Sequence, residues 1–311
     1  MTDEAAAKRN LPLLFAKGMA MGAADVVPGV SGGTIAFISG IYDELLDAIK
    51  GINLTALRVL FSAGPARFWR QINGTFLLVL GAGILASVLS LAKLVSHLLA
   101  TQPLLIWSFF FGLVLASVIY MVRDQRHWRT PQLLALALGA AVALAIAFAP
   151  PLAVAATPVA VFGAGMLAIC AMILPGISGS FILLLIGMYP VIINAVSELD
   201  LAVLALFGAG AAVGLAAFSR VLSWLLHRFR ATTLALLIGF LLGSLPVVWP
   251  WQTAALAAGP QPGVRQLMLP GQYQELLGNP QLLPSLALMA VGLAVVLGLE
   301  YGGSFLARKR S

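Results

Sequence analysis

The chain alternates between long apolar runs and short polar segments, and the longest runs match the thickness of a membrane. A transmembrane helix needs about 20 consecutive apolar residues. The runs are continuous rather than alternating with period two, which favours α-helices over the strands of a β-barrel. They predict six transmembrane helices, at residues 75–99, 103–122, 132–149, 201–226, 232–249 and 282–306.

Two further apolar regions are each interrupted in the middle by the same short motif. The first copy is Val27-Pro-Gly-Val-Ser-Gly-Gly-Thr34 and the second is Leu174-Pro-Gly-Ile-Ser-Gly-Ser-Phe181. Each copy is followed by a glycine and a tyrosine, Gly40 and Tyr42 or Gly187 and Tyr189. Because proline and paired glycines interrupt helices, each region predicts two short helices joined by a break. We interpret residues 11–49 and 159–196 as re-entrant hairpins that enter and leave the membrane on one side.

Composition and charge support this reading and orient it. Hydrophobic residues make up 61% of the chain and charged residues 9%, against about 25% charged residues in soluble domains. The net charge is +7, and nearly all lysines and arginines outside the spans lie at the two termini and in residues 50–73, 123–130 and 227–231, whereas the remaining loops hold Arg265 as their only basic residue. The positive-inside rule then places both termini and the basic loops in the cytoplasm. This topology accounts for the basic charge without nucleic-acid binding.

The two halves of the chain repeat each other. Pro28 and Pro175 of the two motifs are 147 residues apart. The later matches are 127 residues apart: Gly81-Ala-Gly83 with Gly208-Ala-Gly210, Gly112 with Gly239, and Ser117 with Ser244. The difference of 20 matches an insertion at the basic segment 50–73. Each half, 11–149 and 150–306, therefore contains a hairpin and three spans. Since three is odd, the second half is predicted to be inverted, as in many secondary transporters. The predicted fold is an all-α integral membrane protein with an inverted repeat, six transmembrane helices and two re-entrant hairpins.

The two motifs are candidates for an anion site. Helix starts leave backbone N–H groups unpaired and carry partial positive charge, and serine hydroxyls add further donors. Two such starts facing each other could hold a phosphate near the midplane. The alternative is that the hydroxyl residues are ordinary helix caps without a ligand. The predicted phosphate-binding residues of the motifs are Ser31, Gly32, Gly33, Thr34, Ser178, Gly179 and Ser180.

Charged residues inside the apolar runs are few. Lys93 and Arg220 occupy equivalent positions in the two halves, where they either neutralise the phosphate or snorkel to the interface. Asp25 and Glu300 are candidates for proton or sodium coupling, although Asp25 could instead pair with Lys17. The single Cys170 and three histidines show no metal-ligand spacing, so no metal site and no cofactor are predicted.

The doubled motif, with Gly22-Ala-Ala-Asp25 before its first copy, resembles one bacterial family. That family was long described as a domain of unknown function and is now linked to undecaprenyl-phosphate translocation (PopT-type). The resemblance covers residues 12–306. It implies a transporter in the bacterial cytoplasmic membrane that returns undecaprenyl phosphate from the outer to the inner leaflet, where the carrier serves peptidoglycan and other envelope polymers.

Two other functions fit the residues less well. A transporter of another lipid or of a small anion would use the same site chemistry. Gly29-Val-Ser-Gly-Gly33 also fits the G-x-S-x-G pattern of serine hydrolases, but a nucleophilic serine needs a base within reach, and no histidine lies within a predicted span. The prediction is therefore a transporter rather than an enzyme, with the lipid phosphate as its partner and its oligomeric state undetermined.

Overall fold

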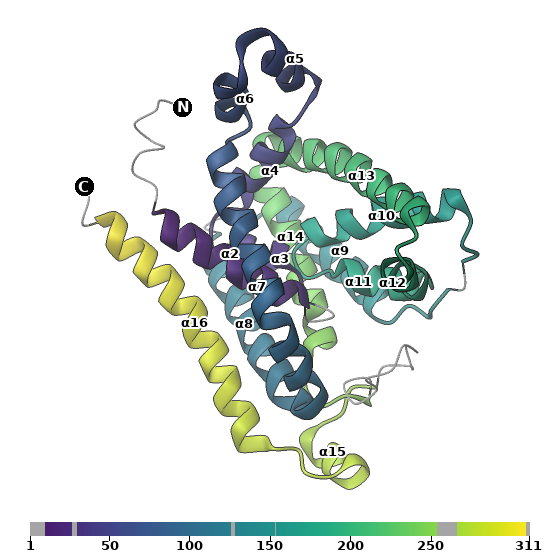
Figure 1. Ribbon diagram of the computed structural model, residues 1–311. Coiled ribbons are helices and arrows are strands. Elements are labelled where there is room, and N and C mark those ends of the chain that lie inside the picture. Colours follow the sequence, from purple (N-terminus) through teal and green to yellow (C-terminus); the bar gives the residue numbers. More distant parts are fainter. Residues whose placement is uncertain (1–9, 27–29, 126–127, 153, 254–265, 309–311) are drawn as a thin grey trace.

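The computed structural model describes residues 10–26, 30–125, 128–152, 154–253 and 266–308 (Figure 1). Apart from one isolated bridge between Gln252 and Leu267, the regular elements in these ranges are helices. The helices of the first half are α2 (Leu11–Val26), α3 (Gly32–Ile38), α4 (Tyr42–Gly51), α5 (Leu54–Ala63), α6 (Pro65–Gln71), α7 (Gly74–Thr101), α8 (Pro103–Asp124) and α9 (Thr130–Ala147). Those of the second half are α10 (Pro158–Ile173), α11 (Gly179–Leu185), α12 (Tyr189–Glu198), α13 (Leu201–Arg228), α14 (Arg230–Ser244), the 3-10 helix η1 (Leu245–Val248), α15 (Pro270–Leu277) and α16 (Leu282–Arg308).

Five of the six predicted membrane helices are present where the apolar runs indicated. Within the described ranges, five helical segments are long and apolar enough to cross a membrane, namely parts or all of α7, α8, α9, α13 and α14 with η1. The bent pair α11–α12 would bring the number to six if it were counted as one span. The predicted sixth span is the 27-residue helix α16, whose apolar part covers residues 282–298. The chain is therefore an all-helical membrane protein.

The second arm of each hairpin is not one helix, as we predicted, but two. In the first hairpin α3 ends before Gly40, and in the second α11 ends before Gly187, with φ angles of +71° and +73°. The Gly40 N–H donates to Phe37 O and the next N–H to Ala36 O. Gly187 and Met188 repeat this pattern, which is the Schellman helix ending that glycine favours. Beyond it the chain turns sharply, and the axes of α11 and α12 are bent by 110°.

Glycines set the helix pairing, and equivalent glycines make equivalent contacts in the two halves. Gly83 of α7 lies against the Phe15 carbonyl of α2, and Gly210 of α13 lies against the Phe162 carbonyl of α10. Phe15 and Phe162 are 147 residues apart, which is also the spacing of the two motif prolines. Small residues allow such close backbone approach between membrane helices. Thus α2 packs on α7 as α10 packs on α13.

The remaining long helices pair across the two halves. Gly112 of α8 lies against the Met289 carbonyl of α16, and Gly239 of α14 lies against the Leu136 carbonyl of α9. The last helix of each half, α9 or α16, therefore packs against a helix of the other half. In Figure 1 α16 and α8 lie side by side along the left of the molecule, in agreement with these contacts.

The three basic loops of the predicted cytoplasmic side meet at one end of the bundle. Arg230, the first residue of α14, forms an ion pair with Asp43 of α4 at 2.6 Å. Gln125 donates to the Ala231 carbonyl at 2.9 Å, and Asn73 donates to Glu44 at 2.7 Å. The acidic start of α4 contains Asp43 and Glu44. It is partly exposed, and it joins these loops.

Candidate functional site

The two interrupted motifs lie against each other at the centre of the molecule. Ser31 Oγ donates to the Met172 carbonyl at 2.7 Å, and the Gly176 N–H donates to Thr34 Oγ1 at 2.9 Å. Tyr42 adds a third bond, from its hydroxyl to the Ile173 carbonyl at 2.9 Å. In all three bonds a side chain of the first hairpin meets a backbone group of the second.

These bonds satisfy the backbone that the second break leaves open. Pro175 has no N–H and Gly176 has a φ of +85°, so α10 ends at Ile173. The last carbonyls of a helix lack intrahelical donors, and an unpaired polar group in a membrane costs several kcal/mol. Ser31 and Tyr42 supply the missing donors for Met172 and Ile173. The first hairpin therefore supplies the hydrogen-bond donors that the backbone of the second hairpin lacks.

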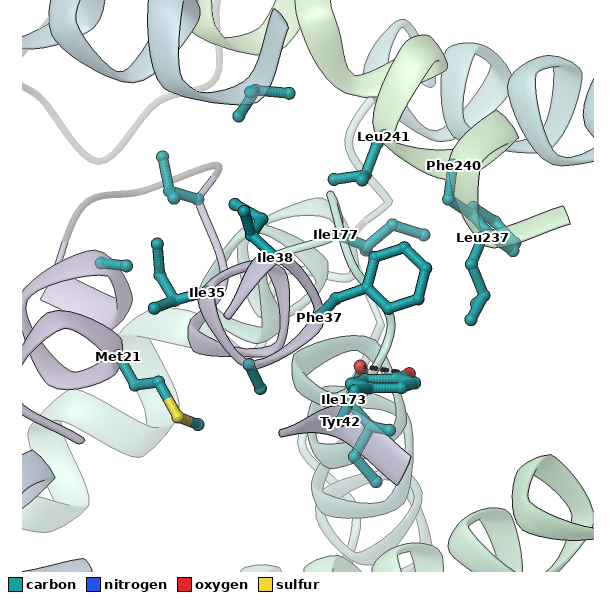
Figure 2. Packing of buried hydrophobic residues seen from close by; sticks show 14 of the residues in the cluster. Met21, Ile35, Phe37, Ile38, Tyr42, Ile173, Ile177, Leu237, Phe240 and Leu241 are labelled. Atoms are coloured by element: carbon teal, nitrogen blue, oxygen red, sulfur yellow. Dashed lines mark hydrogen bonds between the residues drawn. The ribbon is translucent and has the colours of Figure 1, made fainter. Parts of the chain in front are cut away.

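Close contact between the hairpins also depends on Gly33. A Cβ atom placed on this residue would lie 2.5 Å from the Met172 oxygen and 2.6 Å from the Ile173 oxygen. Around it, Phe37 and Ile38 of α3 share one buried apolar cluster with Ile177 and with Leu241 of α14 (Figure 2). The apolar cluster thus joins α3, the second break and α14.

The start of α3 is capped by its own chain. The Gly32 N–H donates to Asp25 Oδ1 at 2.6 Å, and the Gly33 N–H donates to Ser31 Oγ at 3.1 Å. The Asp25 carboxylate, which is partly buried, thus occupies the place in front of α3 that an anion would take. Lys17, which we considered as a partner for Asp25, donates to the Ser39 carbonyl at 2.6 Å.

The second copy of the motif is arranged differently. Ser178 and Ser180 share a hydrogen bond of 2.8 Å between their hydroxyls, and no side chain caps α11. Ser178 also lines a small cavity of about 10 Å³, roughly enough for one water molecule. Its walls come from the second break, from α9 and from α14 with η1, and are formed by Ala143, Ile146, Ala147, Gly176, Ile177, Ser178, Phe181, Ser244 and Val247. The hydroxyls of the first copy hold the hairpins together, whereas those of the second copy bond each other next to a cavity.

The structure does not bring the charged candidates Arg220, Lys93 and Glu300 into described contact with the two motifs. Arg220 is exposed on α13, and its guanidinium donates to the Ala216 carbonyl of its own helix at 2.5 Å. Among the described contacts it makes no hydrogen bond to either motif. The side chains of Lys93, on α7, and of Glu300, on α16, lie outside the part that the structure describes. The structure thus brings the two motifs and Asp25 together without Arg220.

Sequence reasoning missed two residues of this centre. Tyr42 was noted only as part of the glycine–tyrosine pattern, although that pattern signals the helix ending that aims its side chain at α10. Ser244 was noted only as a repeat partner of Ser117, and it lines the cavity with its hydroxyl bonded to the Leu241 carbonyl at 2.8 Å. Their roles depend on contacts between hairpin and bundle, which local sequence does not encode.

Replacing Thr34 by valine tests the bond between the motifs. Thr34 is fully buried, and valine has nearly the same shape but leaves the Gly176 N–H without an acceptor. We expect a loss of about 1–3 kcal/mol in unfolding free energy, measured by SDS-induced unfolding in micelles. Thr34→Ser keeps the hydroxyl and is the matched control, so an equal loss in both variants would contradict the bond's importance.

Comparison with known proteins identifies the relatives of this chain. A family model named VCA0040-like and described as undecaprenyl phosphate translocase-like matches residues 21–265. The chain is 50% identical over 292 residues to a polyprenyl-phosphate transporter of Vibrio cholerae, which covers 92% of this chain and 95% of the relative. It is 35% identical over 252 residues to a polyprenyl-phosphate transporter of Staphylococcus aureus, covering 75% of this chain and 84% of the relative. No solved structure matches. The extent of these matches shows that the chain belongs to the VCA0040-like, undecaprenyl phosphate translocase-like family.

Proposed function

We propose that this protein returns undecaprenyl phosphate from the outer to the inner leaflet of the bacterial cytoplasmic membrane. Two relatives that cover most of the chain are polyprenyl-phosphate transporters. The observation that carries the proposal is the centre, where two broken helices meet and one keeps a pair of bonded hydroxyls, of which Ser178 lines a cavity. A lipid phosphate needs a polar site only for its head, because its tail can stay in the hydrocarbon.

The second copy of the motif is the proposed primary phosphate site. Ser178 and Ser180 can exchange their mutual hydrogen bond for bonds to phosphate oxygens, and Gly179 allows the ligand to approach its backbone. The cavity beside them is too small for a phosphate, so binding requires the second break to move away from α9 and α14. We propose this movement as the step that opens the site.

The first copy joins the site in a second step. Its backbone donors are held by Asp25 and Ser31, so a phosphate reaches Gly32, Gly33 and Thr34 only if the carboxylate withdraws. A phosphate and an ionised carboxylate repel each other, so a proton or sodium ion on Asp25 would favour the exchange. We propose Asp25 as the coupling residue, with Glu300 as the second candidate.

Lys93 and Arg220 are proposed to guide the head group rather than to hold it at the centre. They occupy equivalent positions on α7 and α13, the two helices that pack against the interrupted hairpins. Arg220 lies on an exposed face of α13 beside Val221, which is 53% exposed, and Trp224, which is 57% exposed. A cation on such a face can meet an anionic head group that arrives through the lipid.

An inverted repeat provides the movement between leaflets. The equivalent glycine contacts in the two halves support a division into residues 11–149 and 150–306. The meeting of the basic loops at one end supports cytoplasmic termini. Rocking of one half against the other would expose the central site first to one leaflet and then to the other.

The test is transport in reconstituted vesicles. Purified protein in proteoliposomes is expected to speed the exchange of a fluorescent polyprenyl phosphate between leaflets, measured by loss of the signal to a membrane-impermeant quencher. Failure to exceed protein-free vesicles would overturn the proposal, and uptake of radiolabelled inorganic phosphate in its place would favour a small-anion transporter. A serine hydrolase would instead release products from the lipid, although its candidate nucleophile Ser31 is bonded to the Met172 carbonyl.

A further inference from the structure

Between α4 and α7, the insertion α5–α6 presents apolar side chains that the described protein leaves uncovered. Phe61 is 82% exposed, Ile52 51%, Leu57 47% and Trp69 42%. Leu57 and Phe61 are four residues apart on α5, so they lie on one face of that helix. The two short helices pack on each other, α6 also packs on α7, and the pair stands at one end of the bundle (Figure 1).

The same segment is basic throughout. Residues 50–73 contain one lysine and three arginines but no aspartate or glutamate. Arg58 and Arg67 are exposed, and none of the described acidic residues forms an ion pair with either of them. On α5, Thr55, Arg58 and Ser62 form a polar stripe next to the Leu57–Phe61 face. A helix with one apolar and one basic face is typical of segments that lie in the membrane interface.

A tryptophan places the segment at the membrane boundary. The Trp69 indole N–H donates to Thr75 Oγ1 at 3.0 Å, and the ring lies against Gly74, where the span α7 begins. Tryptophan is enriched at the level of the lipid headgroups. The hydrogen bond therefore fixes α6 at the first turn of α7, a helix long and apolar enough to cross a membrane.

We propose that α5–α6 lies in the headgroup layer of one leaflet and binds anionic phospholipid headgroups there. Leu57 and Phe61 enter the boundary of the acyl chains, while Arg58 and Arg67 pair with lipid phosphates. The insertion has no counterpart in the second half of the chain, so the lipid is bound at one end of the bundle. The proposal does not depend on which molecule the protein transports.

The experiment places a fluorophore in this layer. A Phe61→Cys variant in a Cys170→Ala background is labelled and reconstituted with quencher-bearing phosphatidylglycerol or phosphatidylcholine. We expect quenching by headgroup-level quenchers, with phosphatidylglycerol favoured by roughly fivefold for each arginine. Adding Arg58→Gln and Arg67→Gln is expected to make the two lipids nearly equal.

Two controls isolate the effect. Arg123→Gln with Arg129→Gln removes the same charge from another loop at the same end and is expected to leave the preference at position 61 unchanged. A label at Leu283→Cys, an exposed leucine in a stretch without lysine or arginine from residue 266 to residue 307, is expected to show no preference. Accessibility of the position 61 label to aqueous iodide with equal quenching by both lipids would overturn the proposal. Energy transfer between labels on two protomers would overturn it in favour of a second copy of this chain.

Discussion

Alanine at Gly33 is expected to separate the two broken helices and to abolish transport. Its Cβ would lie 2.5 and 2.6 Å from the carbonyl oxygens of Met172 and Ile173. Both oxygens belong to the backbone and cannot swing aside as a flexible side chain can. Overpacking of this kind costs about 1–3 kcal/mol and occasionally more. We expect about 3 kcal/mol, measured by SDS-induced unfolding in micelles.

The matched control is Gly163→Ala on α10, where a Cβ would meet no atom within 4 Å. It makes the same chemical change in another membrane-embedded helix and removes the same backbone freedom. We expect it to be neutral or slightly stabilising. Equal stability and transport in the two variants would show that the two hairpins do not need their close contact.

Removal of the hydroxyls from Ser178 and Ser180 together is expected to reduce transport with little effect on folding. In the structure these hydroxyls bond each other, so the double change to alanine removes both partners and leaves neither unsatisfied. A hydrogen bond to a charged group contributes about 1.5–3 kcal/mol. Each lost bond to the phosphate should therefore reduce the initial rate of lipid exchange in proteoliposomes by roughly 10- to 100-fold.

Ser197→Ala provides the comparison for this double variant. Ser197 is exposed, and its hydroxyl bonds the Ile193 carbonyl of its own helix, so its loss should not alter transport. Unfolding in SDS separates a lost site from a lost fold. If the folded Ser178→Ala/Ser180→Ala protein moved polyprenyl phosphate at the wild-type rate, the second copy of the motif would not be the phosphate site.

The membrane helices could be located from the sequence because their signal is local and strong. Helices α8, α13 and α16 begin at Pro103, Leu201 and Leu282, as the apolar runs predicted. An apolar run of that length has no other stable environment than lipid. The breaks were equally local, since proline and glycine change the backbone wherever they stand.

The division of each hairpin arm at Gly40 and Gly187 was not predicted, although its signal was visible. The glycine–tyrosine pattern occurs in both copies, and we used it only as evidence of repetition. A glycine with positive φ ends a helix when the following chain has somewhere to turn. That space is supplied by the packing of the hairpin against the bundle, which hydropathy does not report.

Hydropathy, local breaks and the distribution of basic residues by themselves determined an all-helical membrane protein with two interrupted hairpins and one basic side. The tertiary structure alone decided what each motif does. Ser31 bonds a carbonyl 141 residues away and Thr34 accepts from an N–H 142 residues away, whereas Ser178 and Ser180 bond each other. Two nearly identical motifs thus differ in their hydrogen-bond partners, because the unpaired backbone groups of a broken helix bond to whichever distant segment the fold places beside them.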